Sequence, residues 1–109
     1  MRKPSKYKNI RVEYNGIKFA SKAECNRYRQ LEILELGGEI EKIELQPRFP
    51  LHVNGKLVCT YVGDFQYWDK RKHKSVLEDV KGVITDVFRL KRNLFEAVYH
   101  REITIVRAK

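Results

Sequence analysis

The sequence predicts a single α/β domain in which one central mixed β-sheet is flanked by two helices. Its 109 residues suit one domain built around one hydrophobic core. A hydrophobic content of 42%, with 11% aromatic residues, is typical of a folded chain. The pattern runs from a hairpin through a helix, several strands and a second helix to a last strand, which favours an α/β domain with one sheet.

The first third of the chain predicts a β-hairpin followed by a helix. Residues 12–19 alternate around Asn15-Gly16, the strongest short-range signal of a hairpin. Ser21 and Glu24 form an S-x-x-E capping box, which predicts the start of a helix. This helix carries apolar residues at helical spacing and ends at Gly37-Gly38. The apolar residues are Tyr28, Leu31 and Leu34.

The rest of the chain predicts strands and one more helix. Residues 40–45 and 49–53 have strand-like patterns, and Asn54-Gly55 turns the chain into residues 57–68, the longest strand-like run. A polar turn at residues 69–74 leads into a strand at 75–81, and residues 103–106 form the last strand. The helix begins at Thr85. Its apolar stripe and the lone tryptophan are assigned to core or dimer packing: Val87, Leu90, Leu94, Val98 and Trp68.

The charge indicates a polyanionic partner. The chain has 23 Lys and Arg against 14 Asp and Glu, a net charge of +9, so nucleic acid is the first candidate and a membrane surface a weaker one. Residues 1–8 lack the apolar stretch of a signal peptide and predict a flexible basic arm before a domain at 9–109. Cys25 and Cys59 are too few for a disulfide framework or a zinc site, which fits a reducing cytosol.

The segment Asp79-Val80-Lys81-Gly82 is the first candidate for chemistry. Side chains alternate along a strand, so Asp79 and Lys81 share one face, while Glu78 and Val80 share the other. By itself the pair reads as an exposed ion pair at a strand end.

Asp64 changes that reading, because an acid inside the apolar run 61–68 needs a partner or a site to serve. We expect Asp64 to share a face with Val62 and Gln66, and the aromatic residues Tyr61, Phe65 and Tyr67 to share the opposite face. Since the strands on either side of the 69–74 turn are expected to pair, Asp64 and Asp79 should lie on neighbouring strands. Two carboxylates and a lysine on one sheet suggest magnesium-assisted chemistry on a phosphodiester.

These motifs resemble the PD-(D/E)xK nuclease superfamily, and within it a small phage-encoded group related to Holliday junction resolvases. The resemblance covers roughly residues 9–106 and is carried by Ser21–Glu24, Gly63-Asp64-Phe65, Asp79-Val80-Lys81-Gly82 and the basic second helix. It implies a restriction-endonuclease-like fold with Glu24, Asp64, Asp79 and Lys81 as catalytic residues. It further implies that the three acids and the Val80 carbonyl bind the metal, and that Lys91 supplies the basic residue of the second helix. One departure is that Val62-Gly63-Asp64 replaces the Pro-Asp of the family motif.

The expected function is therefore that of an endodeoxyribonuclease dependent on Mg²⁺, or Mn²⁺, that cuts branched or Holliday junction DNA during phage recombination or replication. We expect no membrane partner, a homodimer, and the cytosol of a bacterial host. The residues expected to contact the DNA backbone are Lys70, Arg71, Lys72, Lys74, Arg89, Lys91 and Arg92. Glu24 has a second explanation as a capping residue, and Lys91 as a solvated one.

Two alternatives from other classes stay open. A non-catalytic DNA-binding accessory protein could keep a nuclease-like fold, but it should have lost at least one of the four catalytic positions. An RNA-binding regulator should expose aromatic residues on a sheet face, and the aromatic residues here have the pattern of buried ones.

Overall fold

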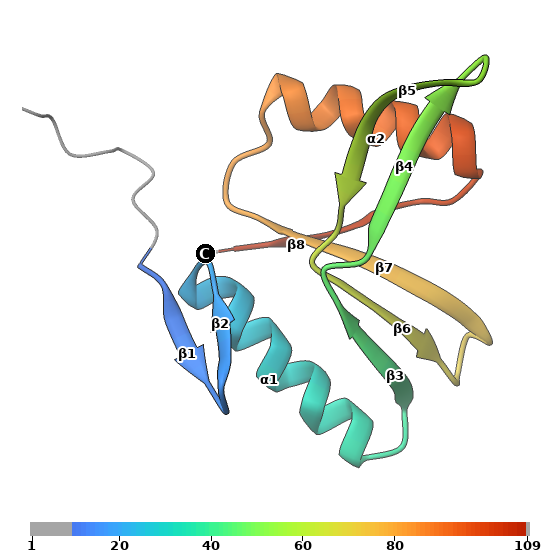
Figure 1. Ribbon diagram of the computed structural model, residues 1–109. Helices are drawn as coiled ribbons and strands as arrows, with labels where there is room; N and C mark the ends of the chain where they lie inside the picture. Colours follow the sequence, from blue (N-terminus) through green and yellow to red (C-terminus); the bar gives the residue numbers. More distant parts are fainter. Residues whose placement is uncertain (1–9, 109) are drawn as a thin grey trace, which may run out of the picture.

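The computed structural model describes residues 10–108, so the predicted basic arm at 1–8 lies outside the described part. The domain is of the α/β class, with its elements arranged as Figure 1 shows. In chain order they are β1 (Val12–Tyr14), β2 (Ile17–Phe19), α1 (Lys22–Leu36), β3 (Ile40–Leu45), β4 (Arg48–Val53), β5 (Lys56–Val62), β6 (Phe65–Asp69), β7 (Lys74–Lys81), α2 (Asp86–Tyr99) and β8 (Thr104–Arg107).

A four-stranded mixed sheet forms the centre of the domain, with the strand order β3-β6-β7-β8. The pairs β3–β6 and β6–β7 are antiparallel, whereas β7 and β8 are parallel because α2 connects them as a crossover. The prediction of a central mixed sheet with two helices and an N-terminal hairpin is confirmed.

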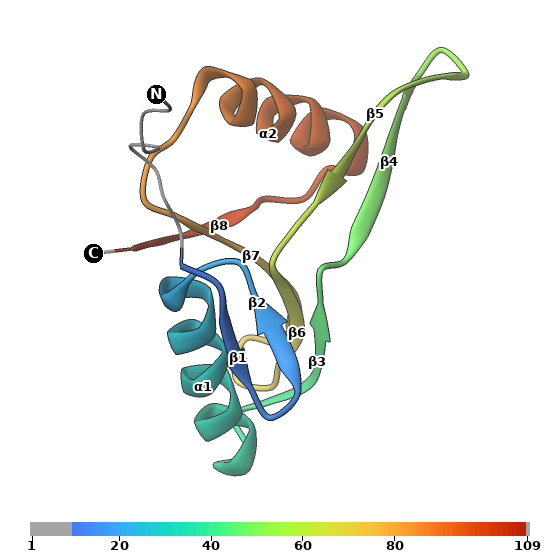
Figure 2. The same ribbon diagram turned by 60° about the vertical axis from the view of Figure 1, so that its left-hand side comes forward.

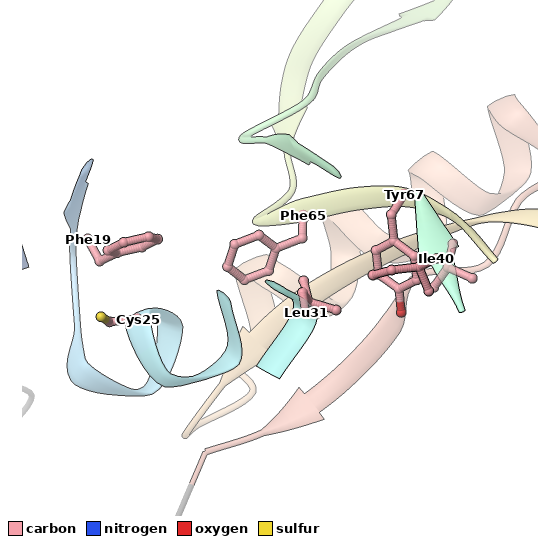
Figure 3. Close-up of a cluster of buried hydrophobic side chains, with 7 residues drawn as sticks. Phe19, Cys25, Leu31, Ile40, Phe65 and Tyr67 are labelled. Atoms are coloured by element: carbon pink, nitrogen blue, oxygen red, sulfur yellow. The ribbon is translucent and has the colours of Figure 1, made fainter. Parts of the chain in front are cut away.

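The two helices cover opposite faces of this sheet. Alternate residues of β7 belong to different core clusters: Val76 packs with α1, and Leu77 packs with α2. Figure 3 shows the α1 side, where Phe19 of β2 and Phe65 of β6 lie in one cluster with Leu31 of the helix. The sheet is therefore the middle of three layers.

The hairpin of β4 and β5 leaves the sheet and runs beside α2. Phe49 packs edge-on against Phe95 and Tyr99 of that helix, with ring centroids 5.1 and 5.4 Å apart. Figures 1 and 2 show the tip of this hairpin extending past the body of the domain. Its turn uses Asn54 (φ 50°) and Gly55 (φ 81°), as the Asn-Gly pair predicts.

The long strand predicted at residues 57–68 is wrong, because the chain breaks at Gly63-Asp64 into β5 and β6. Gly63 N–H donates to the Pro47 carbonyl (3.0 Å), outside the β6–β7 ladder. A Cβ on Gly63 would lie 2.8 Å from Leu77 Cδ1, so any larger residue here would force the buried Leu77 side chain to shift. The break also separates the three aromatic residues that are predicted to share one face. Tyr61 lies in the α2 cluster, whereas Phe65 and Tyr67 lie in the α1 cluster.

Most of the apolar stripe of the second helix is not a core face. Val87 and Leu90 are 67% and 70% exposed, and α2 packs through Phe88, Phe95 and, from the stripe, Leu94. The predicted core packing is therefore confirmed for Leu94 and wrong for Val87, Leu90 and Trp68, which is 38% exposed, while a role of the stripe in a dimer stays a prediction. Within residues 10–108, no helix has the length and apolar composition needed to cross a membrane.

Candidate active site

Asp79 and Lys81 lie on the α2 side of β7, as the alternation along the strand predicts. Asp79 is 3% exposed, and its Oδ2 accepts a 2.5 Å hydrogen bond from the Tyr61 hydroxyl. Its Oδ1 lies 3.3 Å from Lys81 Nζ. The same ammonium stands 4.4 Å from the ring centroid of Phe88, a cation–π contact that holds the lysine against α2. The pair is thus a partly buried cluster and not an exposed ion pair.

Asp64 lies beside this pair because two contacts with the β7 backbone hold it there, and a third ties it to the turn after β3. Its N–H donates to the Glu78 carbonyl (3.0 Å), and its own carbonyl accepts from Gln46 N–H (3.0 Å). Its carboxylate Oδ2 accepts a 2.7 Å hydrogen bond from Val80 N–H. Asp64 therefore lies beside Asp79, as the sequence predicts, but in the bend just before β6 and not on the strand itself, which begins at Phe65.

Glu24 lies in the first turn of α1, and Ser21 Oγ accepts from its backbone N–H at 3.2 Å. The capping role expected of this segment is therefore present. The carboxylate of Glu24 also interacts electrostatically with the other site residues. The charge of Asp79 raises the pKa of Glu24, and the charge of Lys81 lowers it. Capping and a place in the site are compatible for this residue.

The electrostatics show that the acids repel one another. Burial raises the pKa of Asp64 to about 7, with the Asp79 charge as the next cause and Glu24 adding to it, while the Val80 N–H acts in the opposite direction. Burial is also the main cause of the raised pKa of Glu24. Two carboxylates, Asp64 and Glu24, whose charged forms are disfavoured by burial and by the neighbouring charge of Asp79, form a site where a cation is favoured.

The donor chemistry suits Mg²⁺, although residues 10–108 contain no group of three His, Cys, Asp or Glu side chains placed to hold a metal. Mg²⁺ prefers hard oxygen ligands, keeps several waters and usually takes only one or two carboxylates directly. Asp64 and Asp79 could supply such oxygens, with Glu24 reaching the ion through water. For Val80, the observed contact is its N–H to Asp64, and a role of its carbonyl stays a prediction.

A second acidic centre lies behind the site, on the α1 side of β7. Glu78 is 1% exposed and forms two hydrogen bonds with the Arg27 guanidinium, Nε–Oε1 at 2.8 Å and Nη2–Oε2 at 2.6 Å. The Tyr67 hydroxyl donates to the same carboxylate. The expectation that Glu78 faces away from Lys81 is confirmed, and its partner on that face is Arg27.

Sequence reasoning missed Arg27 and Tyr61, the residues that hold the site in place. Arg27 follows Glu24 by three positions, so the two share a helix face, and this spacing could have identified it. Tyr61 had no such signal, because the break after Val62 changes the face on which it lies.

The predicted DNA-contacting residues fall into two groups. The turn with Lys70, Arg71, Lys72 and Lys74 is at the opposite end of the β6–β7 hairpin from Asp64, roughly 17 Å away at about 3.3 Å per residue. In this turn Lys70 Nζ is 4.0 Å from Glu41 and Arg71 Nη1 is 3.4 Å from Glu39.

The second group lies on α2, next to the site. Arg92 stands 6.0 Å from the ring of Phe88, the ring that Lys81 also contacts, whereas Arg89 pairs with Asp86 at 2.7 Å. Lys91 is half-buried on the same helix. The basic residue of α2 that shares an aromatic contact with Lys81 is therefore Arg92, through the ring of Phe88.

The chain belongs to a family described as a protein of unknown function (DUF1064), whose model matches residues 4–109. Neither the curated proteins nor the solved structures gave a match to this chain.

Proposed function

We propose that this protein is a metal-dependent endonuclease that hydrolyses DNA phosphodiester bonds. The observation that carries the proposal is the placement of Asp64, just before β6, beside Asp79 and Lys81 on β7, with the first turn of α1 bringing Glu24 to the same charges. This set agrees with the PD-(D/E)xK resemblance residue by residue. A restriction-endonuclease-like fold is part of the same proposal.

Each residue has a role that its contacts support. Lys81 is placed to orient an attacking water and to offset the charge that develops on the phosphate. Tyr61 fixes the rotamer of Asp79, and the Val80 N–H does the same for Asp64. When bound, Mg²⁺ or Mn²⁺ would lower the pKa of water and polarise the phosphate.

The substrate and setting follow from charge and from the resemblance. A net charge of +9 favours backbone contacts that do not depend on sequence, and Arg92, which shares the Phe88 ring with Lys81, is a candidate for one of them. Branched or Holliday junction DNA, phage recombination or replication, a homodimer and the cytosol of a bacterial host complete the proposal. Two copies would suit the two-fold symmetry of a junction.

The test is cleavage of four-way junction, duplex and single-stranded DNA with Mg²⁺, with Mn²⁺ and with EDTA. We expect metal-dependent cleavage that falls at least about 100-fold in Asp64→Asn and Lys81→Met. Lys56→Met, at the tip of the β4–β5 hairpin, is the matched control and should cleave like the wild type. Cleavage that persists in EDTA, or full activity of the two site variants, would refute the mechanism.

One observation favours a second candidate, a non-catalytic DNA-binding accessory protein. Both carboxylate oxygens of Asp79 already have protein partners, Tyr61 and Lys81, so this acid is satisfied without a metal. Tight DNA binding with no cleavage under any metal would select this candidate.

A further inference from the structure

A small groove opens directly onto the carboxylates. It has a volume of about 110 Å³ and reaches Glu24 and Asp64. One wall comes from the β1–β2 hairpin, and the other comes from the end of β3 and the turn that follows. Its remaining lining residues are Ile17, Lys18, Phe19, Leu45, Gln46 and Phe65.

Apart from Glu24 and Asp64, the lining combines apolar walls with two polar groups of different kinds. Ile17 and Leu45 present aliphatic surface, and Leu45 is 36% exposed. Lys18 is exposed at the rim, where it can contact a phosphate. Gln46 supplies an amide, which can both donate and accept hydrogen bonds. This is the chemistry that recognises a base and its phosphate.

Gln46 is held in an unfavourable backbone conformation at this groove. Its φ is 50°, in the left-handed region that residues other than Gly, Asn and Asp rarely adopt. The conformation lets Gln46 N–H donate to the Asp64 carbonyl, so the residue is tied to the catalytic aspartate. A glycine here would keep the backbone bond without strain, which leaves the side chain as the reason for a glutamine.

We propose that this groove binds one unpaired nucleotide next to the phosphate that is cut, and that Gln46 contacts its base. This rests on the proposed function and extends it, because it names the substrate class: DNA with an unpaired nucleotide at the cleavage point. Pockets for drug-sized ligands have volumes of about 300–1,000 Å³, so about 110 Å³ has room for a single ring system and not for a base pair. A fully paired duplex would leave the groove empty.

The test is DNA binding in EDTA, measured by fluorescence anisotropy, so that it does not depend on catalysis. Two labelled duplexes of the same sequence are compared, one fully paired and one with a single unpaired nucleotide. We expect the wild type to prefer the second by about ten-fold, the scale of one stacked base. Equal affinities for the two duplexes would overturn the proposal.

Two variants that introduce glycine at a residue of positive φ distinguish the loss of the Gln46 side chain from the relief of backbone strain. Gln46→Gly removes the amide and relieves the positive φ, and it should lose the preference while keeping its affinity for paired DNA. His73→Gly relieves the same kind of strain (φ 53°) in the distant β6–β7 turn and should keep the preference. A Gln46→Gly variant that retains the full preference would refute the role of Gln46.

The failure of this inference is distinguishable from failure of the proposed function. A preference for the unpaired nucleotide without cleavage in Mg²⁺ or Mn²⁺ supports the groove and refutes the nuclease. Metal-dependent cleavage with equal affinity for both duplexes refutes the groove and leaves the nuclease standing.

Discussion

Replacing Arg27 with methionine would remove the guanidinium that pairs with buried Glu78. Methionine keeps most of the aliphatic length of the side chain, so the change tests the ion pair more than the packing. Glu78 is 1% exposed and would keep only the hydrogen bond from Tyr67. An uncompensated carboxylate would then remain between α1 and the sheet.

The magnitude follows from the burial of the two partners. Removing one partner of a buried ion pair costs about 3–5 kcal/mol. The Arg27 side chain is 22% exposed, and Tyr67 still donates, so we expect the lower end, about 3 kcal/mol. At about 2.1 cal/mol/K per residue, 109 residues have an unfolding entropy of about 0.23 kcal/mol/K, so Tm should fall by about 13 °C. Since Glu24 lies one turn before Arg27, cleavage should weaken as well.

The assay is urea and thermal unfolding, followed by circular dichroism at pH 7, of Arg27→Met, Glu78→Gln and the double variant. In the double variant the buried charge is gone, so it should recover at least about 1 kcal/mol relative to Arg27→Met. A double variant as unstable as the sum of the two single variants would show that the pair is not coupled, and would refute this reasoning.

Three further predictions concern the site itself. The pKa of Asp64 is raised to about 7, above its unfolded value of about 3.9, so its contribution to stability is full below about pH 4 and is lost as the pH rises through about 7. Asp64→Asn should therefore be more stable than the wild type at pH 8 but not at pH 4, as measured by Tm against pH without metal. A difference in Tm between variant and wild type that does not change with pH would contradict the raised pKa of Asp64. Tyr61→Phe removes the bond to Asp79 and should cost about 1.5–3 kcal/mol in urea unfolding, so a loss under about 0.5 kcal/mol would show that the bond contributes little. Gly63→Ala should lower the free energy of unfolding by about 1–3 kcal/mol through its close contact with Leu77. Gly82→Ala, with no atom within 4 Å of the added Cβ, should change it by no more than about 0.5 kcal/mol. Equal losses in the two variants would contradict the close packing at Gly63.

Local signals predicted the elements that depend on local chemistry. Both Asn-Gly pairs form the expected hairpin turns, and Ser21 and Thr85 are the N-caps from which the two helices begin. The break after Val62 had only the short local signal of Gly63-Asp64, two residue types depleted in strands, because the rest of residues 57–68 favours a strand. Tertiary contacts divide this run into two strands: the hydrogen bond from Gly63 N–H to the Pro47 carbonyl and the close approach of Gly63 to Leu77.

The candidate site was predictable where strand alternation applied, and not beyond it. Alternation placed Asp79 with Lys81 and turned Glu78 away, and both placements agree with the structure. The partners Tyr61 and Arg27 lie 18 and 51 positions away from the acids they contact, so the pattern of one strand could not reveal them. Helical periodicity failed for Val87 because an amphipathic pattern does not say which stripe a protein buries.

The hydrogen bond from the Val80 amide to the Asp64 carboxylate also provides a spectroscopic probe. An amide proton that points at a carboxylate changes its chemical shift when that carboxylate gains a proton, so the Val80 resonance should titrate with Asp64. The same bond joins β7 to the residue just before β6, so exchange of this amide proton with solvent requires that end of the strand pair to open. One backbone NMR signal would thus report both the charge state of the site and the integrity of the sheet that carries it.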